Sequence, residues 1–347
     1  MRSQRSLRLA LIGTGRAGLI HGANIVRRIE RAELVALCDA NPTNLSAAAK
    51  ELGVATCHAS YSAVCADPAV DAVVIVTPTF LHCEIACAAA AAGKHVFLEK
   101  PMALSVDECG DIERACRDAG AKLQIGFMRR FDEGFAKAKA VLDSGDLGRV
   151  MIIKSTGRGP GGPGPWMWDL KQSNGIVAEV NSHDLDSIHW FTGARVRHVY
   201  AEAHNFKMPE ARERFPDFYD NVVATLRLDD DTIAVVDGTC PAHYGYDARV
   251  EILCEKGVLF VGSARRHGCE WITVESGLHG EAVASWRTLF RDAYLAEMES
   301  FVASVLDDQP TKVTGADGRW AVEAVVAINE SLRTGMPVPC GTAEVKA

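Results

Sequence analysis

The stretch LRLALIGTGRAG, residues 7–18, joins a short apolar run to three glycines spaced Gly-x-Gly-x-x-Gly. Leu7–Ile12 predicts a strand, and Leu19–Ile29 has the apolar spacing of a helix. Glycines at such a junction permit a tight turn, close approach of a pyrophosphate and close packing of the helix on the strand. We therefore predict a dinucleotide-binding loop here. Its expected contacts are Gly13, Thr14, Gly15, Arg16, Ala17 and Gly18.

Asp39 follows the next apolar run, Glu33–Cys38, at the distance where an acidic residue meets the adenosine ribose in such folds. A carboxylate at that point accepts a hydrogen bond from a 2′-hydroxyl and repels a 2′-phosphate. The residues directly after it, Ala40–Thr43, include no arginine or lysine that would bind a 2′-phosphate. The sequence therefore predicts NAD, rather than NADP, as the cofactor.

Helical and strand patterns alternate up to about residue 126. Helices are expected at about 43–52, 61–65, 81–92 and 105–119, and strands at about 55–58, 72–76, 95–99 and 122–127. Strands that are apolar throughout and separated by helices are typical of a parallel sheet covered on both faces. We expect residues 1–126 to form a Rossmann-type doubly wound parallel sheet, with Thr77, Pro78 and Thr79 beside the nicotinamide half of the cofactor.

Lys100 comes directly after the apolar run 95–99 and directly before Pro101. The carboxyl end of a strand is the edge at which doubly wound sheets bind their ligands, and a proline restricts the backbone that follows the lysine. We interpret Lys100 as a candidate catalytic group. Glu99 and Lys100 are both expected to lie beside the cofactor.

The pattern changes after a helix expected at Glu133–Leu142, because short strands linked by tight polar turns now predominate. The expected strands are Arg149–Arg158, Val196–Phe206, Asn221–Leu228, Thr232–Thr239, Arg249–Cys254, Val258–Val261 and Glu270–Val274. Helices return over Ser285–Leu306 and within Gly315–Leu332. We predict a second, α+β domain over residues 127–347, with an open, mainly antiparallel sheet flanked by helices.

Ile176–Phe191 is expected to be one helix carrying Glu179, His183 and Asp186. Spacings of four and three residues would place these side chains on one helical face. An imidazole, with a reference pKa of about 6.5, suits proton abstraction at neutral pH. A lone histidine on an apolar helix is more often a core or capping residue, so the spacing by itself does not assign His183 a catalytic role.

The composition excludes several classes of protein. A length of 347 residues favours two domains, and a net charge of −8 without a basic stripe argues against nucleic-acid binding. No apolar run is long enough to span a membrane, and the run after Met1–Leu7 is too short for a signal peptide. Eleven scattered cysteines without a Cys-x-x-Cys pair predict reduced thiols in a cytoplasmic protein, and no metal site is expected.

Taken together, these motifs resemble the glucose–fructose oxidoreductase and inositol dehydrogenase (Gfo/Idh/MocA) family of nicotinamide-dependent oxidoreductases. The matching segments are Gly13–Gly18, Thr77–Thr79, Glu99–Pro101, Gln124–Asp132 and His183–Asp186. They follow the family order over essentially the whole chain. The segment Gly126–Asp132 and the run Tyr244–Asp247 resemble the inositol 2-dehydrogenase branch in particular.

The resemblance implies hydride transfer from a secondary hydroxyl of a cyclitol, such as myo-inositol or a related isomer, to NAD. Lys100 and His183 would form the acid–base pair, with Glu179 orienting the imidazole. Relatives usually carry aspartate at the position of Glu179, which weakens the transfer of substrate specificity. The implied substrate contacts are Lys100, Arg129, His183, Asp186, Tyr246 and Trp166, with Tyr244 less strongly indicated.

Other interpretations remain open from the sequence. Trp166 and Trp168 directly follow the glycine- and proline-rich segment Gly159–Pro165, which would either rim a sugar site or pack on the surface. If it stacks on a sugar ring, the substrate becomes a pyranose, an anhydrosugar or a glycoside. A nicotinamide-sensing regulatory protein is disfavoured, because a sensor does not need both Lys100 and His183. The resemblance also implies a homo-oligomer, a dimer or tetramer, formed through the open sheet.

Overall fold

The structure is a computed structural model that describes residues 6–340, which form two compact units. The first unit contains the described residues up to Phe131 together with Asp292–Val322, and the second contains Asp132–Arg291 and the described residues from Glu323 on. This division differs from the boundary expected at residue 126, because a C-terminal helical segment returns to the first unit. Two of the sequence predictions fall partly outside the described residues. They are the absence of a signal peptide, which concerns residues 1–5, and the last part of the second domain, residues 341–347.

The first unit contains a six-stranded sheet in the order β3-β2-β1-β4-β5-β6, and every pair of neighbours is parallel. This is the doubly wound order of a Rossmann fold, which confirms the predicted class. The strands are β1 (Leu7–Ile12), β2 (Ala32–Cys38), β3 (Cys57–His58), β4 (Ala72–Ile75), β5 (His95–Glu99) and β6 (Leu123–Gly126). The helices between them are α1 (Arg16–Arg28), α2 (Pro42–Leu52), α3 (Tyr61–Ala66), α4 (His82–Ala91) and α5 (Val106–Asp118).

Both faces of this sheet are buried, which explains why its strands are apolar at successive positions. Ile12 belongs to a core cluster that includes Ile112 of α5, whereas the adjacent Leu11 packs in a second cluster with Ile25 of α1. The second cluster also includes Phe301 of α12 (Arg291–Leu306), a helix that begins more than 260 residues after the end of α1. Successive side chains of a strand point to opposite faces, so two helical layers are needed to cover it.

A local capping signal fixes where α5 begins. Ser105, the N-cap of α5, accepts a hydrogen bond from the backbone N–H of Glu108 at 3.2 Å. The Glu108 carboxylate in turn accepts from the N–H of Leu104 at 2.8 Å. Such reciprocal capping satisfies N–H groups that have no partner within the helix. The sequence prediction at this helix is confirmed.

The second unit contains a seven-stranded sheet in the order β12-β11-β7-β10-β9-β8-β15. Only β7 and β10 are parallel neighbours, so the sheet is mainly antiparallel, as predicted. Its strands are β7 (Val150–Arg158), β8 (Val196–His204), β9 (Asn221–Leu228), β10 (Ile233–Thr239), β11 (Asp247–Cys254), β12 (Gly257–Val261) and β15 (Val338–Pro339). Its helices are α6 (Glu133–Asp143), α7 (Leu170–Ser173), α8 (Gly175–Glu179), α9 (Ser182–Thr192), α10 (Pro209–Arg214) and α11 (Trp286–Leu289), and α13 (Gly315–Thr334) begins in the first unit and continues here.

One face of the seven-stranded sheet is buried and the other is open. Alternate residues of β9 and β11 are buried, while the intervening ones are exposed. The register places Tyr200, Val223, Ile233, Leu253 and Phe260 on the open face, where Phe260 is 72% exposed and Val223 is 49% exposed. We call this surface the open face.

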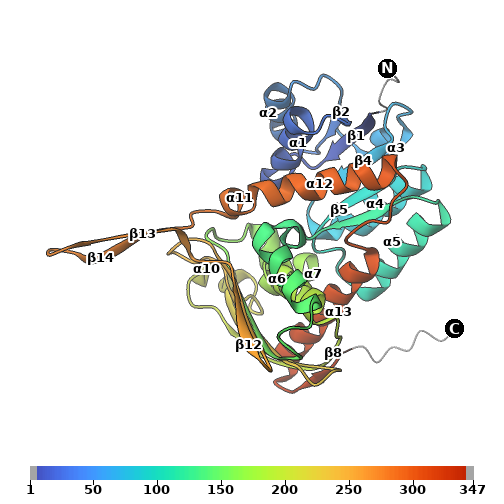
Figure 1. Cartoon of the computed structure of the whole chain (residues 1–347). Helices are drawn as coiled ribbons and strands as arrows, with labels where there is room; N and C mark the ends of the chain where they lie inside the picture. The colour runs from blue at the N-terminus through green and yellow to red at the C-terminus, as the bar shows by residue number, and fades with distance from the viewer. Residues whose placement is uncertain (1–5, 341–347) are drawn as a thin grey trace. The chain divides into compact units, whose positions relative to one another are not determined.

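Two segments of the second half differ from the sequence prediction. The strand expected at Glu270–Val274 is part of β13 (Arg265–Thr273), which pairs with β14 (Gly277–Ala282) in a separate two-stranded ribbon. Figure 1 shows this ribbon extending away from the seven-stranded sheet. The helix expected at Ser285–Leu306 is divided into α11 and α12, because the backbone at Phe290 leaves the helical conformation (φ −103°, ψ 21°).

Within residues 6–340, none of the eleven cysteines forms a disulfide bond. Among the helices of residues 6–340, none combines the length and the apolar character needed to cross a membrane.

Candidate functional site

The glycine loop after β1 has the geometry of a phosphate cradle. Gly13 has φ +98°, and a Cβ there would lie 2.4 Å from the carbonyl oxygen of Val76. A Cβ on Gly18 would lie 2.0 Å from the carbonyl oxygen of Gly13, whereas one on Gly15 would meet no atom within 4 Å. The loop is therefore tightly closed at Gly13 and Gly18 and open at Gly15. The N-terminus of α1, capped by Gly15 without a side-chain hydrogen bond, points its N–H groups at this opening.

Asp39 lies at the end of β2 and is tied to this loop. Its Oδ2 accepts hydrogen bonds from the backbone N–H and the hydroxyl of Thr14, both at 2.8 Å, and its Oδ1 accepts from the N–H of Asn41 at 2.8 Å. A carboxylate offers about four acceptor positions, so one remains for a ribose hydroxyl. Asp39 thus both orders the loop and keeps the acceptor that the sequence analysis assigns to it.

The residues after β4 are held by a buried histidine. The side chain of His82, at the start of α4, lies with Nε2 2.9 Å from the carbonyl oxygen of Thr77 and with Nδ1 2.8 Å from that of Pro101. Burial lowers the pKa of His82, although these two carbonyls and Glu99 oppose that shift. His82 therefore connects the expected nicotinamide segment, Thr77–Thr79, to the residue after Lys100. The sequence analysis assigned no role to it.

Lys100 follows β5 at the carboxyl edge of the first sheet. Phe97 and Leu98 before it have no exposed surface, whereas Lys100 is partly exposed. Its backbone N–H donates to Oε2 of Glu99 at 3.1 Å. Arg129 follows β6 in the chain. It is 1% exposed and belongs to the short 3-10 helix Met128–Phe131. The first unit therefore holds Lys100 where its ammonium group can reach solvent or a ligand.

Glu99, expected to lie beside the cofactor, is 6% exposed and is engaged by protein groups. Its other carboxylate oxygen, Oε1, lies 2.7 Å from Nε2 of the buried His21. Sequence reasoning missed His21 and a third buried group, Glu297, because they lie 78 and 198 positions from Glu99 and no local pattern links them.

In the second unit, the prediction of a single helix over Ile176–Phe191 is wrong. The chain forms α8, ending at Glu179, and α9, beginning at Ser182, with a break between them, where φ of Val180 is −113° and ψ of Asn181 is −2°. Glu179 and His183 thus belong to different helices, and the four-residue spacing does not by itself place them on one face. His183 and Asp186 do share α9, and they are 6% and 1% exposed.

The break has a physical cause in a buried polar network. The Asp184 carboxylate accepts from the Ser155 hydroxyl of β7 at 2.7 Å and from the Asn181 amide at 2.8 Å. Asn181 also donates to the carbonyl of Gly157 at 3.2 Å. These bonds tie the start of α9 to the sheet and so fix the backbone of His183. Asp184 and Ser155 show no local sequence signal for this role.

The remaining predicted contacts have different surroundings within the second unit. Tyr246 is 6% exposed and packs edge-on against Phe290. Tyr244 is 48% exposed, donates to Asp247 and accepts from Arg158. The pKa of Tyr244 is raised by burial and by its bond to Asp247.

The two tryptophans beside Gly159–Pro165 differ in their environment. Trp168 is 9% exposed, its indole N–H donates to the carbonyl of Pro163, and it packs on Phe218. Trp166 is partly exposed. Of the two rings, Trp168 therefore serves packing, and only Trp166 remains a candidate sugar contact.

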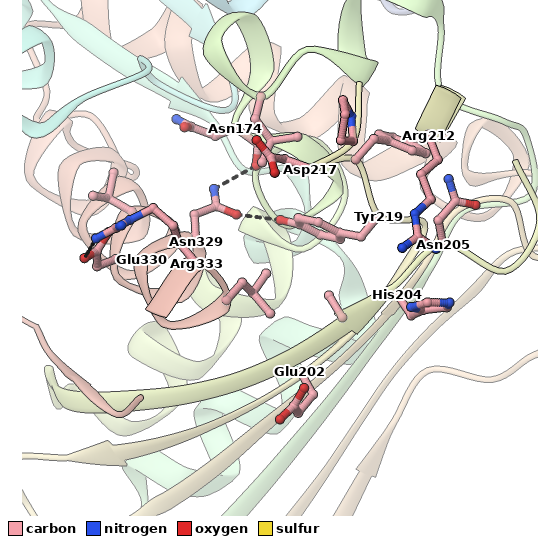
Figure 2. A pocket seen from close by; sticks show the side chains of 16 residues that line it. Asn174, Glu202, His204, Asn205, Arg212, Asp217, Tyr219, Asn329, Glu330 and Arg333 are labelled. Carbon is pink, nitrogen blue, oxygen red and sulfur yellow. Dashed lines mark hydrogen bonds and ion pairs between the residues drawn. The ribbon is translucent and has the colours of Figure 1, made fainter. Parts of the chain in front are cut away.

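A further cavity of the second unit, of about 680 Å³, contains none of the predicted site residues. Figure 2 shows Asn329 at its wall, where the Tyr219 hydroxyl donates to Oδ1 at 2.6 Å and Asn329 donates to the carbonyl of Asn174 at 3.0 Å. Arg333 pairs with Glu330 on the same wall. This cavity is distinct from the residues that the sequence motifs indicate.

A doubly wound domain with an open glycine cradle, followed by a domain with a large open sheet, defines a dinucleotide-dependent oxidoreductase. Residues 7–127 match the family model described as "Oxidoreductase family, NAD-binding Rossmann fold", and residues 135–260 match the "GFO/IDH/MocA C-terminal domain". The chain belongs to the Gfo/Idh/MocA family of NAD-dependent oxidoreductases. The cradle at Gly15 and the ordered Asp39 fit NAD, the cofactor of this family.

Several relatives are similar over almost the whole chain. The scyllo-inositol 2-dehydrogenase (NAD(+)) of Bacillus subtilis is 31% identical over 335 residues, which is 96% of each chain. The myo-inositol 2-dehydrogenase of Thermotoga maritima is 32% identical over 327 residues, 94% of this chain and 96% of that protein. The crystal structure of scyllo-inositol dehydrogenase from Lactobacillus casei with bound NAD(H) and scyllo-inositol has a TM-score of 0.89 at 29% identity, covering 96% and 99% of the two chains.

Proposed function

We propose that this protein oxidises a secondary hydroxyl of a cyclitol, an inositol isomer, to the ketone. The observation that carries the proposal is the lysine held at the carboxyl edge of an NAD-binding sheet, with its N–H fixed by Glu99 at 3.1 Å. Relatives named inositol 2-dehydrogenases share about a third of the sequence over the whole chain, which supports an inositol substrate.

Oxidation of an alcohol removes a hydride from carbon and a proton from oxygen. When bound, NAD accepts the hydride. The Lys100 ammonium would donate a hydrogen bond to the reacting oxygen and stabilise the negative charge that develops there. The chain itself must then supply a group that takes up the proton.

His183 is our candidate for that base, because a neutral imidazole can take a proton at neutral pH. The bonds of Asp184 to Ser155 and Asn181 hold the helix that carries it. Glu179 would stabilise the imidazolium, and its extra methylene relative to aspartate lengthens its reach by about 1.5 Å. Arg129, Asp186, Tyr246 and Trp166 are proposed substrate contacts.

The test follows the absorbance of reduced cofactor with inositol isomers and common sugars as substrates. We expect turnover of an inositol and a loss of kcat of about 100-fold or more in Lys100→Met and in His183→Ala. Lys50→Met and His267→Ala, at exposed positions away from the open face, are the matched controls. If His183→Ala turns over substrate at nearly the wild-type rate, His183 is not the base. Preferred turnover of a pyranose, an anhydrosugar or a glycoside would replace the inositol assignment, and no turnover of any polyol or sugar would favour a nicotinamide sensor.

We further infer a homo-oligomer, a dimer or tetramer, formed through the open face. Tyr200, Val223, Ile233, Leu253 and Phe260 expose apolar surface on that face, which a second copy of the chain would cover. The cytoplasmic location stays a prediction.

A further inference from the structure

Three titratable side chains meet in the interior of the first unit. His21 comes from α1, Glu99 from β5 and Glu297 from α12, and their relative exposures are 0%, 6% and 0%. One potential ligand atom from each lies within 4.8 Å of the other two. The rings of Phe97 and Tyr294 lie edge-on to the imidazole at centroid distances of 5.1 and 5.4 Å, so the surroundings are largely apolar.

The carboxyl group of Glu297 is buried in this cluster without a hydrogen-bond partner among the described residues. Within residues 6–340, no group makes a hydrogen bond to either carboxylate oxygen of Glu297. The neighbouring amide of Gln124 donates to the backbone carbonyl of Glu297 instead, at 2.9 Å. Burial, reinforced by the charge of Glu99, raises the pKa of Glu297 well above its usual range. A buried carboxyl group without partners is more stable with a proton than without one.

A proton fits this geometry better than a metal ion. The 2.7 Å separation of His21 Nε2 and Glu99 Oε1 is that of a direct hydrogen bond. An ion bound by both atoms would need about 2.1 Å to each of them, and the two ligands would then lie about 3 Å or more apart. The imidazole N–H therefore already occupies the position that a cation would take between these two atoms.

Glu99 connects the cluster to Lys100. One of its carboxylate oxygens is bound by His21, and the other accepts the backbone N–H of Lys100 at 3.1 Å. A second negative charge close by would repel the Glu99 carboxylate and disturb this orientation, so a neutral Glu297 favours it. The titratable groups that face Glu297 are His21 on α1 and Glu99 on β5, and the Glu99 charge also acts on His82.

We propose that His21 and a protonated Glu297 are positioning residues of the dehydrogenase, which hold the Glu99 carboxylate in the orientation that fixes the backbone of Lys100. The inference rests on the proposed role of Lys100. Neither residue touches the substrate, because both are enclosed in the first unit. Their contribution is to the placement of the lysine, so it is expected in kcat more than in the affinity for NAD.

The proton on Glu297 is tested by the pH dependence of thermal unfolding in the full-length protein. In the unfolded chain Glu297 loses its proton near its usual pKa, about 4.5, whereas the folded protein keeps it. Native stability that depends on this proton is therefore complete below that pH and is lost as pH rises towards the folded pKa. Relative to Glu297→Gln, which cannot titrate, wild-type Tm should fall by about 3 °C or more between pH 5 and pH 8.

A wild-type Tm that stays constant or rises relative to Glu297→Gln over this range would overturn the protonated state. So would a stoichiometric divalent metal found by elemental analysis of the purified protein and lost in that variant. Glu299→Gln, at an exposed position of the same helix, is the control and should leave the pH dependence unchanged. None of these measurements depends on catalysis, so they remain informative if the proposed function fails.

The positioning role is tested by kinetics. His21→Leu removes the donor to Glu99 and should lower kcat about tenfold, with the dissociation constant for NAD changed less than about threefold. His21→Gln can restore an N–H donor and should recover most of the loss. Equal kcat in wild type and His21→Leu would overturn the inference, while an unchanged kcat in Lys100→Met would instead overturn the proposed function on which it rests.

Discussion

The Nδ1 atom of His82 lies 2.8 Å from the backbone carbonyl oxygen of Pro101. Its other nitrogen faces the carbonyl of Thr77 at 2.9 Å. A neutral imidazole has one N–H, so only one of these contacts can be a hydrogen bond at a time unless the ring is protonated. His82 thus acts on the residue directly after Lys100, while Glu99, the residue directly before it, accepts the backbone N–H of Lys100 itself.

Replacement of His82 with alanine should destabilise the first unit by about 1–3 kcal/mol, because two buried carbonyl groups lose a polar neighbour. Since burial lowers the pKa of His82, the unfolded chain binds its proton more readily than the folded protein. Wild-type stability should therefore decline as pH falls below about 6.5, and His82→Ala should lose that part of the pH dependence. Chemical denaturation at several pH values measures both effects, and an unchanged slope would show that His82 does not titrate.

Gly15→Ala should weaken NAD binding without changing stability. A Cβ at this position meets no atom within 4 Å, and the backbone at Gly15 (φ −72°, ψ −167°) suits alanine. The added methyl group would occupy the opening where the pyrophosphate approaches the backbone. Isothermal titration calorimetry measures the affinity for NAD, and a thermal melt measures the stability. Gly110→Ala, also in open space, is the control; equal NAD affinity in both variants would contradict the cradle.

Asp39 controls both loop order and the choice of cofactor. Asp39→Ser with Ala40→Arg should reduce kcat/KM with NAD by about tenfold or more and raise that with NADP, because the repelling carboxylate is replaced by a cation. The same change removes the acceptor of the two Thr14 bonds, so some loss of stability should accompany it. Thr14→Val, which removes the hydroxyl bond to Asp39 and spares the carboxylate, separates loop effects from the choice of cofactor. A wild-type preference for NADP would refute the assignment.

Phe260→Lys should weaken self-association through the open face. Phe260 is 72% exposed and lies opposite Glu251 on β11, so a lysine there gains a cross-strand partner within one chain and leaves the sheet intact. Light scattering with size-exclusion chromatography should show a smaller assembly than wild type. Val26→Lys, at an exposed apolar position of α1, should not change the assembly. An unchanged mass in both variants would place the interface elsewhere.

Much of the candidate site follows from local sequence, because each part is a short motif with its own chemistry. The glycine loop, Asp39 after β2 and Lys100 after β5 were predicted, and the structure places them at strand ends of one parallel sheet. The helix with Glu179 and His183 was predicted wrongly, since the Asn181 amide binds a strand carbonyl and interrupts it. Apolar periodicity does not reveal such a long-range bond.

The sequence by itself determined the class of the first sheet and its cofactor, because parallel strands, glycine turns and capping residues act over a few positions. Only the tertiary structure decided which distant residues surround them. His21, Glu99 and Glu297 meet because α12 packs on the same sheet as α1. A buried group acquires its protonation state from neighbours that the chain brings together only on folding. For that reason Glu99 beside Lys100 could be predicted from the sequence, whereas the residues that support it could not.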